Sequence, residues 1–117
     1  MIHAAHVVLY NKDAEATRAF FRDVLKFESV DAGHGWLIFA LPPAEAGIHP
    51  TAGENHHQLY LMCDDIHSTV KELSARGVEF TLPVKEERFG LLTAFRIPGG
   101  DELFLYEPRH PSPLNLA

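Results

Sequence analysis

The sequence has a single cysteine, no run of basic residues and no long apolar segment. Cys63 has no second cysteine to pair with, so an internal disulfide is excluded. The 117 residues include 10 Lys or Arg against 16 Asp or Glu, a formal net charge of -6. Nucleic-acid binding draws on clustered positive charge, so no nucleic-acid partner is expected.

No apolar run approaches the roughly 20 residues that a membrane-spanning helix needs. The N-terminal residues Met-Ile-His-Ala-Ala-His lack the charged and apolar regions of a signal peptide. We therefore expect no membrane partner and a cytoplasmic location. Hydrophobic residues make up 46% of the chain, enough for the core of one domain, whereas two independent domains would each be too small.

An internal repeat is the main feature that is present. A strand followed by a helix occurs once near the N-terminus and again 52 residues later, the difference between positions 13 and 65. The pairs at this spacing are Asp13 and Asp65, Thr17 and Thr69, Tyr10 and Met62, and His6 and Gln58. Such repeats usually build two similar modules around one shared site. We assign module 1 to about 1–52, module 2 to about 56–108 and a tail to 109–117 of a single domain.

Each half predicts the order strand, helix, strand, strand, strand. Apolar residues that recur every three or four positions predict helices over 14–25 and 66–76. The first helix is predicted to be capped by Asp13. Lys26 stands where a glycine usually ends a helix, which indicates a modest strain or a different exit. The predicted strands are 4–10, 27–32, 36–41 and 46–49 in the first half, and 59–63, 78–82, 90–97 and 102–107 in the second. Residues 83–88 are predicted as a charged loop and the tail as extended.

Strand alternation separates the two faces of each predicted strand. Cys63 falls on the face turned toward the second helix, where a buried and inert thiol is expected. Tyr10, Tyr60, Phe104 and Tyr106 fall on the opposite face, which favours an apolar cavity with a few hydroxyl groups. A packed sheet face or a dimer interface would account for the same four aromatic residues.

The pattern His6, Asp13, Thr17, Phe20-Phe21-Arg22-Asp23-Val24-Leu25 and Phe27, closed by Pro98-Gly99-Gly100 and the strand 103–108, resembles the vicinal oxygen chelate superfamily. That superfamily includes glyoxalase I, extradiol dioxygenases, fosfomycin resistance enzymes and bleomycin resistance proteins. The resemblance covers nearly the whole chain. It implies an α+β fold of two βαβββ modules, which form a curled mixed sheet around a cavity and are commonly completed in a homodimer. One fold here carries many chemistries.

The metal-dependent members of that superfamily take ligands from the first and last strands of each module. The resemblance therefore implies His6, His49 and Gln58 as ligands of a possible divalent ion: zinc, iron, manganese, nickel or cobalt. Phe104 stands where the typical enzymes carry a glutamate, and phenylalanine can neither offset the charge of a metal nor act as a base. Glu102 shares that strand face roughly 7 Å away and is the candidate base. The other interpretation is that His6 and His49 are hydrogen-bonded polar groups lining a cavity.

Two hypotheses follow for the function. The first is a glyoxalase- or dioxygenase-like protein with a degenerate divalent-metal site that acts on a small organic substrate. The second is a metal-free protein that sequesters a small molecule, as bleomycin resistance proteins do, with an acidic rim that favours a cationic ligand. A protein interaction module without a ligand is the third alternative. Neither the reaction, the substrate nor a catalytic residue can be assigned from the sequence.

Overall fold

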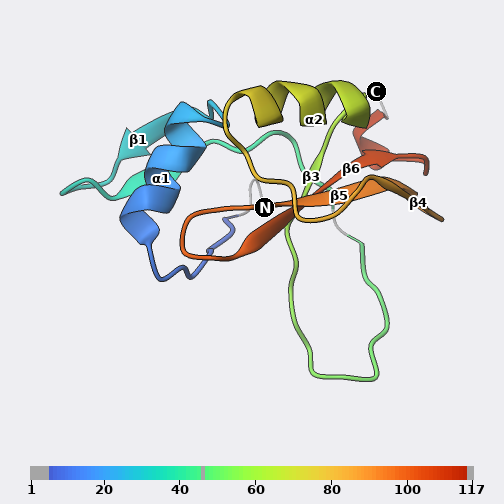
Figure 1. Cartoon of the computed structure of the whole chain (residues 1–117). Coiled ribbons are helices and arrows are strands. Elements are labelled where there is room, and N and C mark those ends of the chain that lie inside the picture. Colours follow the sequence, from blue (N-terminus) through green and yellow to red (C-terminus); the bar gives the residue numbers. More distant parts are fainter. Residues whose placement is uncertain (1–5, 46, 116–117) are drawn as a thin grey trace.

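The computed structural model describes residues 6–45 and 47–115. Its elements are α1 (Ala14–Asp23), β1 (Ser29–Asp31), β2 (Leu37–Phe39), β3 (Tyr60–Met62), α2 (Ile66–Ala75), β4 (Lys85–Glu87), β5 (Gly90–Arg96), β6 (Glu102–Pro108) and the 3-10 turn η1 (Pro113–Asn115). Figure 1 shows α1 beside the β1–β2 hairpin, and α2 lying across a larger sheet. The predicted α+β class is confirmed. Within the described residues, no helix is long and apolar enough to cross a membrane.

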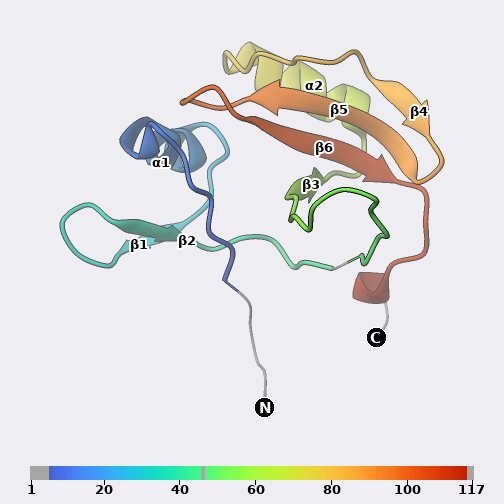
Figure 2. The same cartoon turned by 90° about the horizontal axis from the view of Figure 1, so that it is seen from below.

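The second half forms a strand, a helix and three further strands, the order that its sequence predicts, although one strand lies elsewhere than expected. Its sheet has the order β3-β6-β5-β4, with β3 parallel to β6 and the other pairs antiparallel. In the β3–β6 register Tyr60 lies opposite Phe104, and Met62 opposite Tyr106. Because side chains alternate along a strand, Phe104 and Tyr106 share the sheet face that is turned away from α2. Figure 2 shows α2 behind this sheet.

The hydrophobic core is continuous through both halves. Phe95 of β5 and Ile66 of α2 are fully buried at its centre. The ring of Phe95 contacts Phe20 of α1 and Phe80, with centroid distances of 6.2 and 5.8 Å. Phe21 of α1 belongs to the same cluster. Side chains of both halves thus pack into one cluster.

Both helices are capped by aspartates, α1 by the predicted Asp13 and α2 by Asp65, its counterpart in the repeat. The carboxylate of Asp13 accepts a hydrogen bond from the backbone N–H of Ala16, and that of Asp65 from the N–H of Ser68, each at 3.2 Å. Each cap satisfies one of the free amides in the first helical turn. After α1, Lys26 adopts φ 64, the left-handed conformation usually left to glycine, so the strain expected at this position is present.

The first half differs from its predicted strand order. Strands 27–32 and 36–41 are present in shortened form as the antiparallel hairpin β1–β2. The strands predicted at 4–10 and 46–49 are wrong for the residues described, because 6–10 and 47–49 pair with no strand; residues 1–5 and 46 lie outside them. By analogy with β3 and β6, the two segments would have to pair with each other. Prolines at 42, 43 and 50 flank the second of these segments, and proline has no N–H to donate to a ladder.

Two predictions in the second half also need correction. The strand predicted at 78–82 is reduced to a single bridge between Phe80 and Phe95, and β4 lies instead at 85–87, inside the predicted loop. Pro83 has no N–H to donate, so pairing with β5 is interrupted there and resumes after it. The described part of the tail is not simply extended: it turns back through η1, and the Ser112 hydroxyl donates to the Glu45 carboxylate.

Candidate functional site

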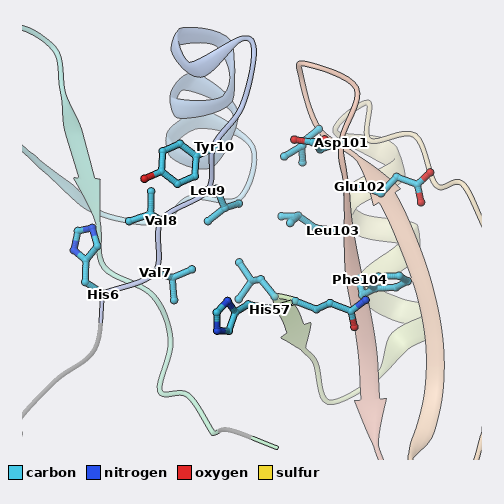
Figure 3. Close-up of a pocket in the computed structure, with 13 residues that line it drawn as sticks. His6, Val7, Val8, Leu9, Tyr10, His57, Asp101, Glu102, Leu103 and Phe104 are labelled. Carbon is cyan, nitrogen blue, oxygen red and sulfur yellow. The ribbon is translucent and has the colours of Figure 1, made fainter. Parts of the chain in front are cut away.

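A hollow of about 680 Å³ lies between the N-terminal segment and the start of β6. Figure 3 shows residues 6–10 forming one wall and residues 101–104 forming the wall across from it. The residues that border it are His6, Val7, Val8, Leu9, Tyr10, His57, Gln58, Leu59, Ile97, Asp101, Glu102, Leu103 and Phe104. The two copies of the internal repeat therefore both contribute to this hollow, because His6 and its counterpart Gln58 border it.

The N-terminal wall presents its apolar side chains to the hollow. In Figure 3, Val7 and Leu9 are directed toward β6, whereas His6 and Tyr10 are directed away from it. Tyr10 is 91% exposed. The alternation that was predicted for this segment is present, but within one chain its polar face is turned outward. Substrate contact by Tyr10 stays a prediction.

The opposite wall carries an ordered aromatic pair. The rings of Tyr60 and Phe104 stack with centroids 4.8 Å apart and planes 16° apart. The hydroxyl of Tyr60 donates to Oε1 of Gln58 at 2.9 Å. This contact follows from the parallel register of β3 and β6, which sets Tyr60 directly opposite Phe104. Three of the predicted site residues are thus brought together on one surface.

The fourth aromatic residue, Tyr106, lies farther along the same face and does not border the hollow. Its side chain is 8% exposed, and its hydroxyl is 3.1 Å from Nε2 of His110. The same nitrogen lies 3.6 Å from the carboxylate of Glu45. Burial raises the pKa of Tyr106, and the charge and hydrogen bond of Glu45 raise it further. The phenol therefore stays protonated at neutral pH and keeps its O–H as a hydrogen-bond donor.

Sequence reasoning missed Glu45 and His110. The Glu45 carboxylate is 67 residues away in sequence from its partner Ser112, and both the segment that holds it and the tail lack periodic structure. No spacing or motif therefore connects the two segments. The proximity depends on how the tail turns back after β6.

The charged groups that border the hollow are acidic. Asp101 Oδ2 accepts from the side-chain amide of Asn11 at 3.3 Å, and Glu102 Oε2 accepts from the hydroxyl of Thr81 at 3.0 Å. None of the 13 residues that border the hollow is Lys or Arg. Two carboxylates and no Lys or Arg along the border of the hollow favour a positively charged guest.

The residues predicted to hold a metal are only partly brought together. His6 and Gln58 border the hollow, but His49 lies in the long loop outside it. Among the described residues, no group of three His, Cys, Asp or Glu side chains is close enough to hold an ion. The Gln58 oxygen already accepts from Tyr60, and Phe104 offers no donor atom. As placed within one chain, this donor set does not fit a metal ion, and ligation by these residues stays a prediction.

The single thiol lies where its strand alternation predicts. Cys63 packs against the core on the face turned toward α2. Its Sγ donates to the backbone oxygen of Tyr106 at 3.6 Å. Burial raises the pKa of the thiol, and the charges of Glu107 and two neighbouring aspartates act in the same direction. Because the thiolate is the reactive form, Cys63 is no nucleophile at neutral pH.

A strand, a helix and three further strands joined in the order β3-β6-β5-β4, with a hollow beside the aromatic face, define a protein built on the βαβββ module. The model of the Glyoxalase/Bleomycin resistance protein/Dioxygenase superfamily matches residues 3–108. The chain therefore belongs to this superfamily, also called the vicinal oxygen chelate superfamily. No curated protein matches the sequence.

Solved structures of several superfamily proteins are similar over most of the chain. TnmS3, an antibiotic binding protein from Streptomyces sp. CB03234, is 26% identical with a TM-score of 0.62, covering 92% of this chain and 99% of its own. Lactoylglutathione lyase from Agrobacterium tumefaciens is 18% identical with a TM-score of 0.64, covering 90% and 92%. A superfamily member from Sphaerobacter thermophilus is 24% identical with a TM-score of 0.58, covering 92% and 96%. The last two show the fold alone.

Proposed function

We propose that this chain binds a small planar organic cation in the hollow between residues 6–10 and β6, without needing a metal. The observation that carries this proposal is the stack of Tyr60 on Phe104. Phe104 borders the hollow at the position where the typical metal enzymes of the superfamily carry a carboxylate. An aromatic ring at that place can hold a planar ligand by dispersion and by contact with its π-face.

The charge of the ligand follows from the side chains around this stack. Asp101 and Glu102 border the same hollow, and no lysine or arginine does. A cation would gain Coulomb energy from these carboxylates, whereas an anion of equal size would be repelled. The similarity to TnmS3 supports binding as a function, because that protein is described as an antibiotic binding protein.

The test compares two planar probes of opposite charge. Proflavine is a planar cation at neutral pH, and anthracenecarboxylate is a planar anion of similar size. We expect proflavine to bind with a measurable heat in isothermal titration calorimetry and to raise the melting temperature, and the anion to do neither. Asp101→Asn with Glu102→Gln should weaken proflavine binding. Equal binding of both probes, or binding of neither, would contradict the proposal.

A second candidate function, a glyoxalase- or dioxygenase-like metalloenzyme, is favoured by one observation. His6 and Gln58, the counterparts in the internal repeat, border the same hollow. A divalent ion would supply Lewis-acid stabilisation of a developing oxyanion there. The donor atoms that one chain brings together do not fit such an ion, so this candidate ranks second.

Elemental analysis separates the two candidates. The protein would be purified without an affinity tag and dialysed against zinc, manganese, iron, nickel or cobalt. A stoichiometric metal that is lost in both His6→Ala and His49→Ala would favour the enzyme. Retention of the same metal content in both variants would dismiss these ligands, and His67→Ala, on the exposed face of α2, is the matched control.

We also propose that a second copy of this chain completes the first half. Residues 6–10 are the counterpart of β3 but pair with no strand in the part of the chain that the structure describes, whereas β3 pairs with β6. Exposed apolar side chains gather in this half: Val7, Val8, Tyr10, Val30, Trp36, Ile38 and Ile48. Water-exposed apolar surface on this scale marks an association surface. Sedimentation velocity should show twice the 13.1 kDa chain mass, and Ile48→Lys should shift it toward monomer while Leu114→Lys does not. A monomer at all concentrations would refute this.

A further inference from the structure

The side chain of Asn11 joins the N-terminal wall of the hollow to the turn that precedes β6. Its amide nitrogen donates to the backbone oxygen of Pro98 at 2.9 Å and to Oδ2 of Asp101 at 3.3 Å. Its amide oxygen accepts from the backbone N–H of Asp13 at 2.7 Å. One residue thus connects the end of segment 6–10, the start of α1 and a turn that lies 87 residues farther along the chain.

The turn at 98–101 closely surrounds this side chain. A Cβ atom added at Gly99 would collide with the amide oxygen of Asn11 and lie 2.9 Å from its Cγ. Gly99 also has φ +88, a conformation that glycine adopts without strain. The hydroxyl of Thr17, a buried residue of α1, donates to the same oxygen of Pro98 at 3.0 Å. The turn therefore contacts both the segment and the helix that follows it.

Segment 6–10 makes few other hydrogen bonds to the rest of the chain. Among the described residues, no ladder or backbone hydrogen bond joins it to another segment. All five of its residues border the hollow. Among the hydrogen bonds of the described residues, those of Asn11 with the turn therefore set the position of this segment relative to β6.

We propose that Asn11 is a positioning residue that holds the N-terminal wall at the mouth of the hollow and orients the Asp101 carboxylate for the ligand. The ligand part of this inference rests on the proposed function. Asp101 both borders the hollow and accepts from Asn11, so one contact sets the distance between the walls and the direction of a charged group. Holding both before the ligand arrives lowers the free-energy cost of binding.

Two adjacent glycines provide a matched pair of variants. Gly99 and Gly100 have φ +88 and +94, so alanine is strained to a similar degree at either position. A Cβ atom added at Gly99 would displace Asn11. A Cβ atom added at Gly100 would have no atom within 4 Å, so it displaces nothing. Asn11→Asp is the independent variant: it keeps the acceptor for Asp13 but loses both donated hydrogen bonds and sets two carboxylates side by side.

The first readout needs no ligand. Trypsin cleaves after Lys12, which lies between the two residues that the amide oxygen of Asn11 connects. Cleavage requires local opening, so its rate reports the open population. We expect Gly99→Ala and Asn11→Asp to raise this rate about tenfold, since two hydrogen bonds are worth roughly that factor. Gly100→Ala, which introduces the backbone strain without displacing Asn11, should raise it much less. Equal rates in Gly99→Ala and Gly100→Ala, or a wild-type rate in Asn11→Asp, would overturn the positioning role.

The second readout is the dissociation constant for proflavine. It should rise severalfold in Gly99→Ala and change much less in Gly100→Ala, because Asp101 is no longer held toward the ligand before binding. Asn11→Asp is tested by cleavage alone, since its added carboxylate would itself attract the cation. Faster cleavage with an unchanged dissociation constant would overturn the link between Asn11 and the ligand site. A wild-type protein that binds neither probe fails the proposed function, and the cleavage rates then decide by themselves whether Asn11 holds the wall.

Discussion

The ring of Tyr60 lies face to face with the ring of Phe104, with centroids 4.8 Å apart. The pair comes from two strands that are 44 positions apart in sequence but aligned in a parallel ladder, in which residue 60 is opposite residue 104. At the same place the metal enzymes of the superfamily carry a carboxylate. A stacked ring at this place presents a flat apolar face where a carboxylate would present a charge.

Phe104→Ala should therefore impair binding more than folding. The substitution removes one ring of the stack and part of the hollow's wall. We expect a loss of about 1 kcal/mol in the free energy of unfolding, since an aromatic pair is worth roughly that much, and at least tenfold weaker proflavine binding. Urea unfolding and calorimetry measure the two effects. Phe89→Ala is the matched control, because Phe89 contacts Tyr106 but does not border the hollow; equal loss of affinity in both variants would refute a local role for Phe104.

The start of α2 offers a test of local stability. Asp65 accepts from the N–H of Ser68, whereas its neighbour Asp64 is exposed and makes no such bond. Asp65→Ala should lower the free energy of unfolding by about 1 kcal/mol, a typical cost for losing an N-cap. Asp64→Ala should change it by much less. Urea denaturation of both variants provides the comparison, and a similar loss in each would show that net charge, not capping, is responsible.

The stability should decline at alkaline pH. Burial raises the pKa values of Cys63 and Tyr106 in the folded protein. In the unfolded chain these groups ionise near their ordinary values, about 8.5 and 10. The folded state keeps protons that the unfolded state has released, so stability is complete below about pH 8 and falls as the pH rises through both groups.

Substitutions at Cys63 and Tyr106 test whether these two groups cause the loss of stability at alkaline pH. Cys63→Ala should flatten the first part of the fall and Tyr106→Phe the second, as measured by urea unfolding at a series of pH values. Tyr10→Phe is the control, because Tyr10 is exposed. A decline that persists unchanged in both of the first two variants would mean that other groups cause it.

Local patterns predicted the elements that depend on local chemistry. The cap at Asp13, the strained exit at Lys26 and the hairpin β5–β6 all depend on residues within a few positions of one another. The inward face of Cys63 follows from simple alternation. Features that depend only on residues close in sequence can be predicted without knowing the rest of the fold.

The incorrect predictions concern strands whose partners lie elsewhere. Residues 6–10 have a strand-like sequence, but a strand forms only where a neighbour offers a ladder, and 47–49 do not supply one. Likewise the Asn11 contact with Pro98 and the Glu45 contact with Ser112 join segments that no periodic pattern relates. The hollow could be foreseen only through the repeat that pairs His6 with Gln58, and which side chains face into it depends on the tertiary arrangement.

The carboxylate of Glu45 should govern the titration of Tyr106. Its charge and hydrogen bond raise the phenol pKa after burial, which is the larger cause. Glu45→Gln should therefore lower this pKa without returning it to the ordinary value, since burial remains. The protein has three tyrosines, so a Tyr10→Phe, Tyr60→Phe background isolates the tyrosinate absorbance of Tyr106. Glu54→Gln, in the exposed loop, is the control. A pKa that is unchanged by Glu45→Gln would show that the tail does not hold Glu45 against Tyr106 in solution.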